Sequence, residues 1–547
     1  MAESKPQSII FESSLVSMDK QKYHNALDEG QLLKQTSAPY RGFNANANRL
    51  VGISRLIGLM VFVISAQLQA QHYGPLGHGY YAGIHAARVN PALTAYSAYD
   101  IHFNIIGGWV NANNSYLKLS LPYSAYKFID NGMAPQYKTE NGNPTFDTSW
   151  IKERINGNNK FLAAGAQVYG PSVMLKFKGV TVGLLTDVNV SARASGISEP
   201  LAHAILKDMS INRNAYQYFN FDANNTNKTY TIPKATVSVN SWVSTGINVS
   251  YAIPQIWKKQ LLIGITAKRV WGIGGGYAQV GEMNFTQPTR EKIILDQTSI
   301  KYGTYTGSGS GSGVDLGLGW VYHKPDYKQN GYYRSHHKQY IYKFGLSVMD
   351  IGAIRYRKAE TRQILNAAPQ VWDMQNERDR FLTMDYSING LDNILKTELS
   401  TLEANKGELM VGLPTRLVFS VDYMLKKQFF INTQWVQSLR SRYSIHARYQ
   451  SFLMVAPRYE TPFFEVSLPL ALEYDYRSFR AGAMVRVGWF YIGTNSLMSL
   501  LNTKQVRDAD LYLGVAISAL TGSRSALKMQ KFIESRSVKK VDSCHKM

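Results

Sequence analysis

The residues of this 547-residue chain that could do chemistry together are acids and arginines in the segment 462–493. Glu465 and Glu473 precede a turn-like sequence, DYRS, and Arg480 and Arg486 follow it. Each alternates with apolar neighbours, so all four fall on one face of a pair of extended strands. Opposite charges on one face form cross-strand ion pairs. Such pairs either brace a wall or line the path of an ion or substrate, and the sequence leaves both readings open.

The same segment has the period of β-strands. Its other face carries apolar residues such as Leu468, Leu470, Val485 and Val487. The strands are about 11 residues long, against about 5–6 in most water-soluble proteins, and this length suits a tilted strand that crosses a bilayer. A two-layered sandwich also alternates, but its strands are shorter and its polar face meets water. We therefore expect the apolar face to contact lipid and the charged face to line an enclosed interior.

Alternation of this kind recurs along the chain. Its clearest examples are the segments 101–105, 117–121, 180–190, 246–251, 314–320, 340–348 and 416–425. We expect about 14 strands, within a range of 14–16, and no stretch after residue 70 approaches the length of a transmembrane helix. Open strand edges are untenable in lipid because their backbone groups stay unpaired. The predicted fold is an all-β, transmembrane antiparallel β-barrel.

The charged face of this barrel predicts an ionic network in the lumen. Its members are Asp422, Glu465, Glu473, Arg480 and Arg486. If DYRS forms a four-residue turn, Tyr474 lies opposite Phe479 in the lipid-facing set. Glu473 then lies opposite Arg480, and Glu465 lies diagonal to Arg486.

The N-terminal part of the chain resembles an export signal. Residues 49–70 contain basic residues, a short apolar run and a small final residue, which are typical of a secretory signal peptide. Cleavage is expected between Ala70 and Gln71. Residues 1–48 are polar, and they are either a real extension or the result of a start set too far upstream.

The rest of the chain divides into a plug-like segment, a barrel and a tail. Residues 71–99 are rich in Gly and Tyr, and the barrel is expected over 100–520. Two insertions interrupt its strand pattern, at 122–168 and at 353–415. The second insertion is the longer one and is expected to be partly helical, because apolar residues recur there at helical spacing. These residues are Leu391, Ile394, Leu395, Leu399 and Leu402. A shorter helix is expected at 148–155, and the basic tail comprises 521–547.

The formal net charge of +22 raises the question of an anionic partner. Nucleic acid is the usual partner of a basic protein. For an exported barrel, anionic lipid headgroups and lipopolysaccharide phosphates are the better candidates. The densest basic and aromatic cluster, 322–343, reads as a solvated loop between strands. We expect outer-membrane lipid and lipopolysaccharide as partners and no nucleic acid.

No constellation for catalysis or metal binding stands out. The sequence contains neither GxSxG nor HExxH, so the usual hydrolase and metalloprotease motifs are missing. His336 and His337 are adjacent, and adjacent side chains of a strand point to opposite faces. The Gly- and Ser-rich stretch 303–315 has no lysine after its glycines and opens no helix, unlike a phosphate-binding loop. We expect no enzyme activity, cofactor or metal.

Four stretches of the chain resemble a Bacteroidota-type outer-membrane barrel family of unestablished function. They are GIHAARVNPALTAYSAYDIHFN, LPTRLVFSVDYMLKKQFFINTQW, APRYETPFFEVSLPLALEY and VRVGWFYIGTNSLMSLL. The NPA at Asn90, Pro91 and Ala92 also resembles the N-terminal plug element of FadL-type transporters of hydrophobic compounds. Accessory barrels of the type IX secretion system look similar at this level. The resemblance implies an outer-membrane barrel in which these three residues sit inside or beneath the barrel as a plug.

Two functions remain open from the sequence. The first is a FadL-like channel or transporter in the outer membrane for a small compound, with hydrophobic compounds as one candidate class. The second is a non-transporting envelope scaffold or secretion accessory whose loops bind other envelope proteins. A transporter should contain a continuous cavity, with either an apolar pocket next to its plug or a break in a strand that opens sideways to lipid. A scaffold should have a filled lumen and a large exposed patch on its loops.

Overall fold

The computed structural model describes most of the expected barrel. The described residues are 74–123, 134–138, 148–177, 179–199, 202, 227, 229–254, 259–289, 292–296, 298–323, 340–366, 369–373, 402–497, 505–506 and 508–520. Several predictions fall outside these residues and stay predictions. They concern the extension 1–48, the signal peptide with Ala70 and Gln71, the expected helix up to Leu399, the histidines at 336–337 and the tail 521–547. Leu402, the last residue of that expected helix, begins a strand instead, Leu402–Gly412.

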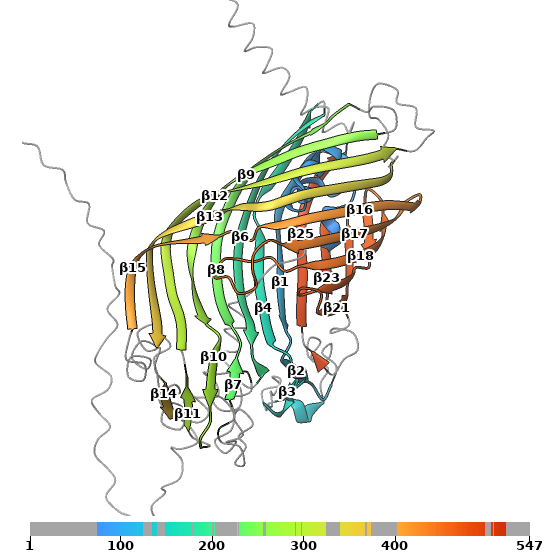
Figure 1. Ribbon diagram of the computed structural model, residues 1–547. Coiled ribbons are helices and arrows are strands. Elements are labelled where there is room, and N and C mark those ends of the chain that lie inside the picture. Colours follow the sequence, from blue (N-terminus) through green and yellow to red (C-terminus); the bar gives the residue numbers. More distant parts are fainter. Residues whose placement is uncertain are drawn as a thin grey trace, which may run out of the picture. The chain divides into compact units, whose positions relative to one another are not determined.

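Antiparallel strands form a sheet that closes on itself (Figure 1), because β1 pairs with β25 on one side and with β4 and β5 on the other. Interruptions at Pro171, Pro414, Pro469 and Gly482 divide four of the strands, so that 18 segments build 14 barrel strands. In order around the barrel the segments are β1 (Tyr99–Asn114), β4 (Lys160–Tyr169), β5 (Ser172–Phe177), β6 (Val180–Ile197), β8 (Ala235–Ala252), β9 (Lys259–Val280), β12 (Thr298–His323), β13 (Tyr340–Asn366), β15 (Leu402–Gly412), β16 (Arg416–Lys426), β17 (Phe429–Ser438), β18 (Phe452–Glu460), β19 (Phe464–Ser467), β20 (Leu470–Glu473), β21 (Ser478–Ala481), β22 (Ala483–Val487), β23 (Phe490–Thr494) and β25 (Asp508–Leu520). The predicted closed barrel is confirmed.

The two faces of the wall differ as the alternation predicted. Leu468 and Leu470 are 50% and 45% exposed on the outside, whereas Glu465 and Arg480 are 1% and 3% exposed on the inside. Aromatic side chains gather at one rim of the outer face, and the rings of Phe429 and Tyr459 lie 4.9 Å apart there. Others at the same rim are Tyr251, Trp320, Tyr342, Tyr423 and Phe464. An apolar band with an aromatic girdle is the surface that a transmembrane barrel presents to lipid.

The hairpin between β20 and β21 has a different register from the predicted one. Glu473 pairs with Ser478, and Arg480 pairs with Ala471, so the register is displaced by two residues. Since the displacement is even, each charged residue keeps its face. The turn begins at Tyr474, whose φ of 56° lies in the left-handed region. This backbone conformation turns Tyr474 inward, where it is buried, so its expected place in the lipid-facing set was wrong.

Several strands continue into the expected insertions. Residues 160–169, 353–366 and 402–412 belong to barrel strands, although their sequences lack a continuous apolar face. Outside a bilayer, backbone pairing continues without any need for apolar side chains, so the alternation disappears while the strand does not. The short helix expected at 148–155 is a single 3-10 turn, η5 (Thr148–Trp150), followed by a strand, β3 (Ile151–Glu153).

Two small sheets accompany these extensions, and Figure 1 shows them at one end of the barrel. One contains β7 (Thr229–Ile232), β10 (Met283–Thr286), β11 (Lys292–Leu295) and β14 (Gln370–Asp373). The other contains β2 (Leu117–Ser120), β3 and β24 (Gln505–Val506). At the opposite end, β5 and β6, β16 and β17, β18 and β19, and β22 and β23 are joined by turns of two or three residues. β12 and β13 are joined by a longer connection at this same end, whereas at the other end all connections except that between β20 and β21 are long. We call the two the end with short turns and the end with long loops.

A basic residue on the outer face should cost stability. Leu316 points outward about four residues inside the aromatic rim, so we expect Leu316→Arg to lower the free energy of unfolding from lipid vesicles by about 2–4 kcal/mol. Val371, on β14, is similarly exposed but lies outside the barrel, so Val371→Arg is the matched control. Equal unfolding midpoints for the two variants in urea titrations would contradict a lipid-facing Leu316.

Candidate functional site

A segment of 3-10 helices lies inside the barrel at the end with short turns. We call residues 74–98 the lumenal segment, which contains η1 (Gly74–Gly77), η2 (Gly83–Arg88) and η3 (Pro91–Tyr96). Most of its side chains are buried. Its small residues Ala82, Ala86 and Ala92 pack with inward residues of the wall in one apolar cluster. The segment thus fills this end of the lumen (Figure 1).

The Asn90–Pro91–Ala92 sequence is the point where this segment contacts the wall. Asn90 is extended and caps η3, because its side-chain oxygen accepts a hydrogen bond from the Ala92 N–H at 2.9 Å. Its amide nitrogen donates to the carbonyl oxygens of Leu318 and Leu346, at 2.8 and 3.2 Å. Pro91 occupies the first helical position, where its missing N–H is harmless. One asparagine therefore begins the helix and attaches it to two strands.

Glycines in the wall make this contact possible. A Cβ added to Gly264 would lie 2.5 Å from backbone atoms of Pro91 and Ala92, and one added to Gly317 would lie 2.1 Å from the Asn90 side chain. Only glycine leaves room for such a close backbone approach. The sequence showed glycines on the inward face without indicating what they contact.

Three of the predicted network residues lie in one buried group near the lumenal segment. Arg486 lies 3.0 Å from Glu465, and Asp422 lies 2.8 Å from Arg458. Arg458 has no exposed side-chain surface and also lies 2.9 Å from Glu460. Glu460 accepts a hydrogen bond from the Tyr81 N–H at 3.0 Å, and Lys343 donates to the His78 carbonyl at 2.5 Å. The group thus joins the wall to the lumenal segment.

The other two predicted residues form a separate group. Arg480 lies 2.6 Å from Glu473 and 3.1 Å from Asp508. Tyr474 donates to the Asn111 side chain at 2.6 Å beside them. The structure therefore divides the five predicted residues between two groups. Neither Glu473 nor Arg480 lines the cavities described below.

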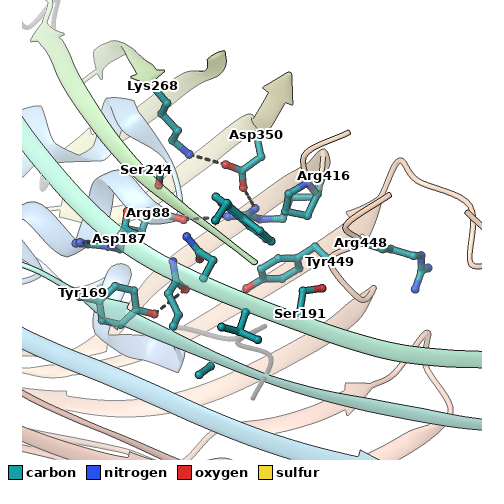
Figure 2. A pocket seen from close by; sticks show the side chains of 16 residues that line it. Arg88, Tyr169, Asp187, Ser191, Ser244, Lys268, Asp350, Arg416, Arg448 and Tyr449 are labelled. Carbon is teal, nitrogen blue, oxygen red and sulfur yellow. Dashed lines mark hydrogen bonds and ion pairs between the residues drawn. The ribbon is translucent and has the colours of Figure 1, made fainter. Parts of the chain in front are cut away.

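A third polar group, which the sequence did not single out, surrounds a cavity of about 70 Å³ (Figure 2). Arg88 of the lumenal segment lies 2.8 Å from Asp187. Across the cavity, Lys268 lies 2.6 Å from Asp350, and Asp350 also pairs with Arg416. This volume holds only a few water molecules.

Tyrosine rings cover two of these arginines. The Arg88 guanidinium carbon lies 4.5 Å from the centre of the Tyr169 ring, and that of Arg416 lies 4.1 Å from the centre of the Tyr449 ring. A ring face attracts a cation and restricts its movement. The arginines are therefore held between carboxylates and aromatic faces around the cavity.

The connection between β17 and β18, residues 439–451, folds inward from the end with long loops. Its Tyr443 carbonyl accepts hydrogen bonds from Thr236 at 3.1 Å and from Gln279 at 2.7 Å. Arg440 donates to the Leu413 carbonyl at 3.1 Å. The next strand, β18, begins only at Phe452. We call residues 439–451 the inward loop, and the cavity of Figure 2 lies between it and the lumenal segment.

Burial and neighbouring charges shift the pKa of three side chains that lie outside the spanning strands, His78, His85 and Asp475. Burial lowers the pKa of His78 to about 4. Burial and the nearby His102 lower the pKa of His85 well below its ordinary value. Both histidines of the lumenal segment are therefore neutral at pH 7. Burial would raise the pKa of Asp475, but the hydrogen bond and charge of Arg448 lower it below its ordinary value.

An apolar groove of about 580 Å³ lies on the outer face, opposite the Asn90–Pro91–Ala92 contact. Its lining includes the outward side chains of Ile263, Ile265, Leu316 and Leu318. Gly264 and Gly317 belong to this part of the wall and have no side chains. The groove and the contact with the lumenal segment therefore lie on opposite faces of the same strands.

The described residues contain no group of three or more His, Cys, Asp or Glu side chains that could hold a metal ion. No helix among them is long and apolar enough to span a membrane.

Arg88, Lys268, Asp350 and Arg458 are residues of the polar groups that the sequence analysis did not identify. The alternation along β9 places Ile263 and Ile265 on the outward face and Lys268 on the inward face, so the sequence could have identified Lys268. No feature of the sequence around Arg88 indicates its role.

The Glu473–Arg480 pair should brace the wall. Glu473→Gln removes one charge of a buried pair that lines neither cavity, so we expect a loss of about 1–3 kcal/mol in the free energy of unfolding with unchanged single-channel conductance. The matched control is Glu408→Gln, because Glu408 pairs with Arg355 on the surface, where such pairs contribute little. Altered conductance with normal heat resistance in Glu473→Gln would instead place the pair on a path.

Comparison with solved structures returns membrane barrels at low similarity. A mutant of the TodX monoaromatic hydrocarbon channel is 10% identical, with 80% of this chain and 94% of that chain covered and a TM-score of 0.33. The toluene transporter TodX of Pseudomonas putida is 9% identical, with 82% and 98% covered and a TM-score of 0.27. The translocator domain of the autotransporter NalP from Neisseria meningitidis is 7% identical, with 77% and 88% covered and a TM-score of 0.23. The fold described above follows from the strand pairing of this chain and not from these likenesses.

No curated protein matches the chain. A family model described as a family of unknown function (DUF5723) matches residues 91–495, which include η3 and all barrel strands from β1 to β23. The expected likeness to a family of unestablished function is thereby confirmed, whereas a Bacteroidota origin and a link to type IX secretion stay predictions. The chain belongs to the DUF5723 family.

Proposed function

We propose that this protein is a plugged channel of the outer membrane that passes a small solute. The lumenal segment, with Asn90, Pro91 and Ala92, acts as the plug. The observation that carries this proposal is the polar cavity of Figure 2, which lies inside a closed barrel between the lumenal segment and the inward loop. The lining of this cavity is polar, whereas an apolar pocket was expected beside the plug of a transporter.

The two ends of the barrel support an orientation. Bacterial outer-membrane barrels have short turns on the periplasmic side and longer loops on the extracellular side. By this rule the lumenal segment lies at the periplasmic end, and the inward loop enters from outside. A solute would first meet the inward loop, then the cavity, and finally the plug.

The proposed state of the plug is closed. A cavity of about 70 Å³ is far smaller than the roughly 300–1,000 Å³ of sites that hold drug-sized ligands. Passage therefore requires the lumenal segment or the inward loop to move. Much of the contact between the lumenal segment and the wall is polar, including the Arg88–Asp187 pair and the hydrogen bonds of Asn90. Water can replace such contacts, which supports a plug that moves without exposing a large apolar surface.

The chemistry of the cavity favours a polar solute over a hydrophobic one. Charged and hydroxyl side chains surround the cavity of Figure 2, whereas the apolar groove of about 580 Å³ lies on the lipid-facing side. A hydrophobic compound in the lumen would displace water from these polar side chains and leave them without hydrogen-bond partners. Such a compound would therefore remain in the groove or the bilayer. We therefore retain the transporter hypothesis but not the hydrophobic class of compound.

The second candidate function is a non-transporting envelope scaffold. The observation that favours it is the pair of small sheets at the end with long loops, which offer a surface to another envelope protein. Three groups of buried ion pairs also fill much of the lumen, as expected of a rigid support. Pore activity separates the two candidates.

Loosening the plug should open the channel. Gly264→Ala places a Cβ against the backbone of Pro91 and Ala92, so we expect openings in planar bilayers to become at least about tenfold more frequent, which corresponds to about 1.4 kcal/mol against the closed state. Gly108→Ala is the matched control, because its Cβ would meet only the Gln167 carbonyl at 3.5 Å.

Absence of channel openings in both variants, with native heat resistance, would exclude the channel and favour the scaffold. Equal activity of the two variants would show that the plug does not control the opening.

A further inference from the structure

A second polar cavity lies between the inward loop and the end with long loops. It measures about 40 Å³, and its lining includes Arg442, Arg448, Arg477 and Asp475. Arg448 also lines the cavity of Figure 2. Arg448 therefore lies between the two chambers.

Cationic side chains outnumber anionic ones in both chambers. Around the cavity of Figure 2, the cations Arg88, Lys268, Arg416 and Arg448 face Asp187 and Asp350, and the buried Asp315 lies 2.7 Å from Lys268. Around the second cavity, Arg442, Arg448 and Arg477 stand against Asp475 alone. Counted once each, the lining residues of the two chambers together with Asp315 comprise six cations and four carboxylates, a surplus of two cations.

A further arginine lies between the chambers. Ser191 lines the first cavity and Ser195 the second, and Arg193 lies between them on the same inward face of β6. Arg193 is 3% exposed, and it donates to the carbonyl oxygens of Ser444 and His446 in the inward loop. Its Nη1 is buried without a hydrogen-bond partner among the described residues. Such a donor is costly unless a ligand or water sometimes binds it.

The carboxylates in the chambers are occupied with holding these cations in place. Asp475 lies 2.6 Å from Arg448, and Asp350 joins Lys268 to Arg416. The remaining positive charge faces a confined space with low-dielectric walls, where field lines concentrate and counter-ions accumulate. Pores lined by Arg and Lys select anions on this principle.

We infer that the lumen selects small anions, such as inorganic anions and short carboxylates. This inference rests on the proposed channel function and names its substrate class. Arg442 and Arg477 receive the anion at the end with long loops. Arg448 and Arg193 pass it beyond the inward loop, and Lys268, Arg416 and Arg88 hold it beside the plug. No bond is made or broken in this sequence of steps.

The reversal potential in a potassium chloride gradient tests the inference. We expect the Gly264→Ala channel to favour chloride over potassium by at least about threefold. Adding Arg442→Gln and Arg477→Gln should reduce that preference at least about twofold. Arg477 is exposed and Arg442 half-buried, so both substitutions should leave the barrel intact.

The matched control adds Lys152→Gln and Lys301→Gln instead. Both lysines are exposed and line neither chamber, so the chloride preference should stay unchanged. A channel that conducts but favours potassium, or that shows no preference, overturns the anion inference and leaves the proposed channel standing. Absence of current in every variant overturns the proposed function, and the inference falls with it.

Discussion

The requirement that every backbone N–H and C=O be paired inside hydrocarbon determines most of this structure. A closed antiparallel sheet meets the requirement, since β1 and β25 join its two edges. Closure gives the wall two unequal faces and creates an interior that lipid cannot fill. The side chains of that interior must be compatible with water during insertion and with each other afterwards. The ion pairs, the wall glycines and the lumenal segment all follow from this condition.

The interior is filled with charges in matched positions rather than with a continuous apolar core. Arg458 is fully buried among Asp422, Glu460 and Glu465, and removal of any one partner would leave an uncompensated charge in a low dielectric. The same group also binds the lumenal segment through Tyr81 and the wall through β16, β18 and β19. The residues that brace the wall therefore also hold the lumenal segment near the end with short turns. Toward the other end the balance changes, and the chambers around Arg448 carry surplus positive charge.

Parity along the strands was the part of the sequence that carried reliable information. Because side chains alternate strictly, it assigned Leu468 and Leu470 to the outside and Glu465 and Arg480 to the inside. Parity does not define register, and the positive φ of Tyr474 moved the pairing of Glu473 by two residues. Parity gives no information where the chain leaves the strand conformation, and for this reason it does not indicate the inward loop. The Arg88–Asp187 pair joins residues 99 positions apart, and only the closed barrel brings them together.

The central claim is that the lumenal segment closes the lumen by resting against the wall, and a reversible cross-link tests it most directly. The hydroxyl oxygens of Thr94 and Ser250 lie 2.6 Å apart, close enough for cysteines at these positions to form a disulfide. Single-channel recording of the Thr94→Cys/Ser250→Cys protein, with Cys544 replaced by serine, should show no openings when oxidised and restored openings after reduction with dithiothreitol. Openings that persist at the same frequency in protein shown to be fully cross-linked would contradict the account.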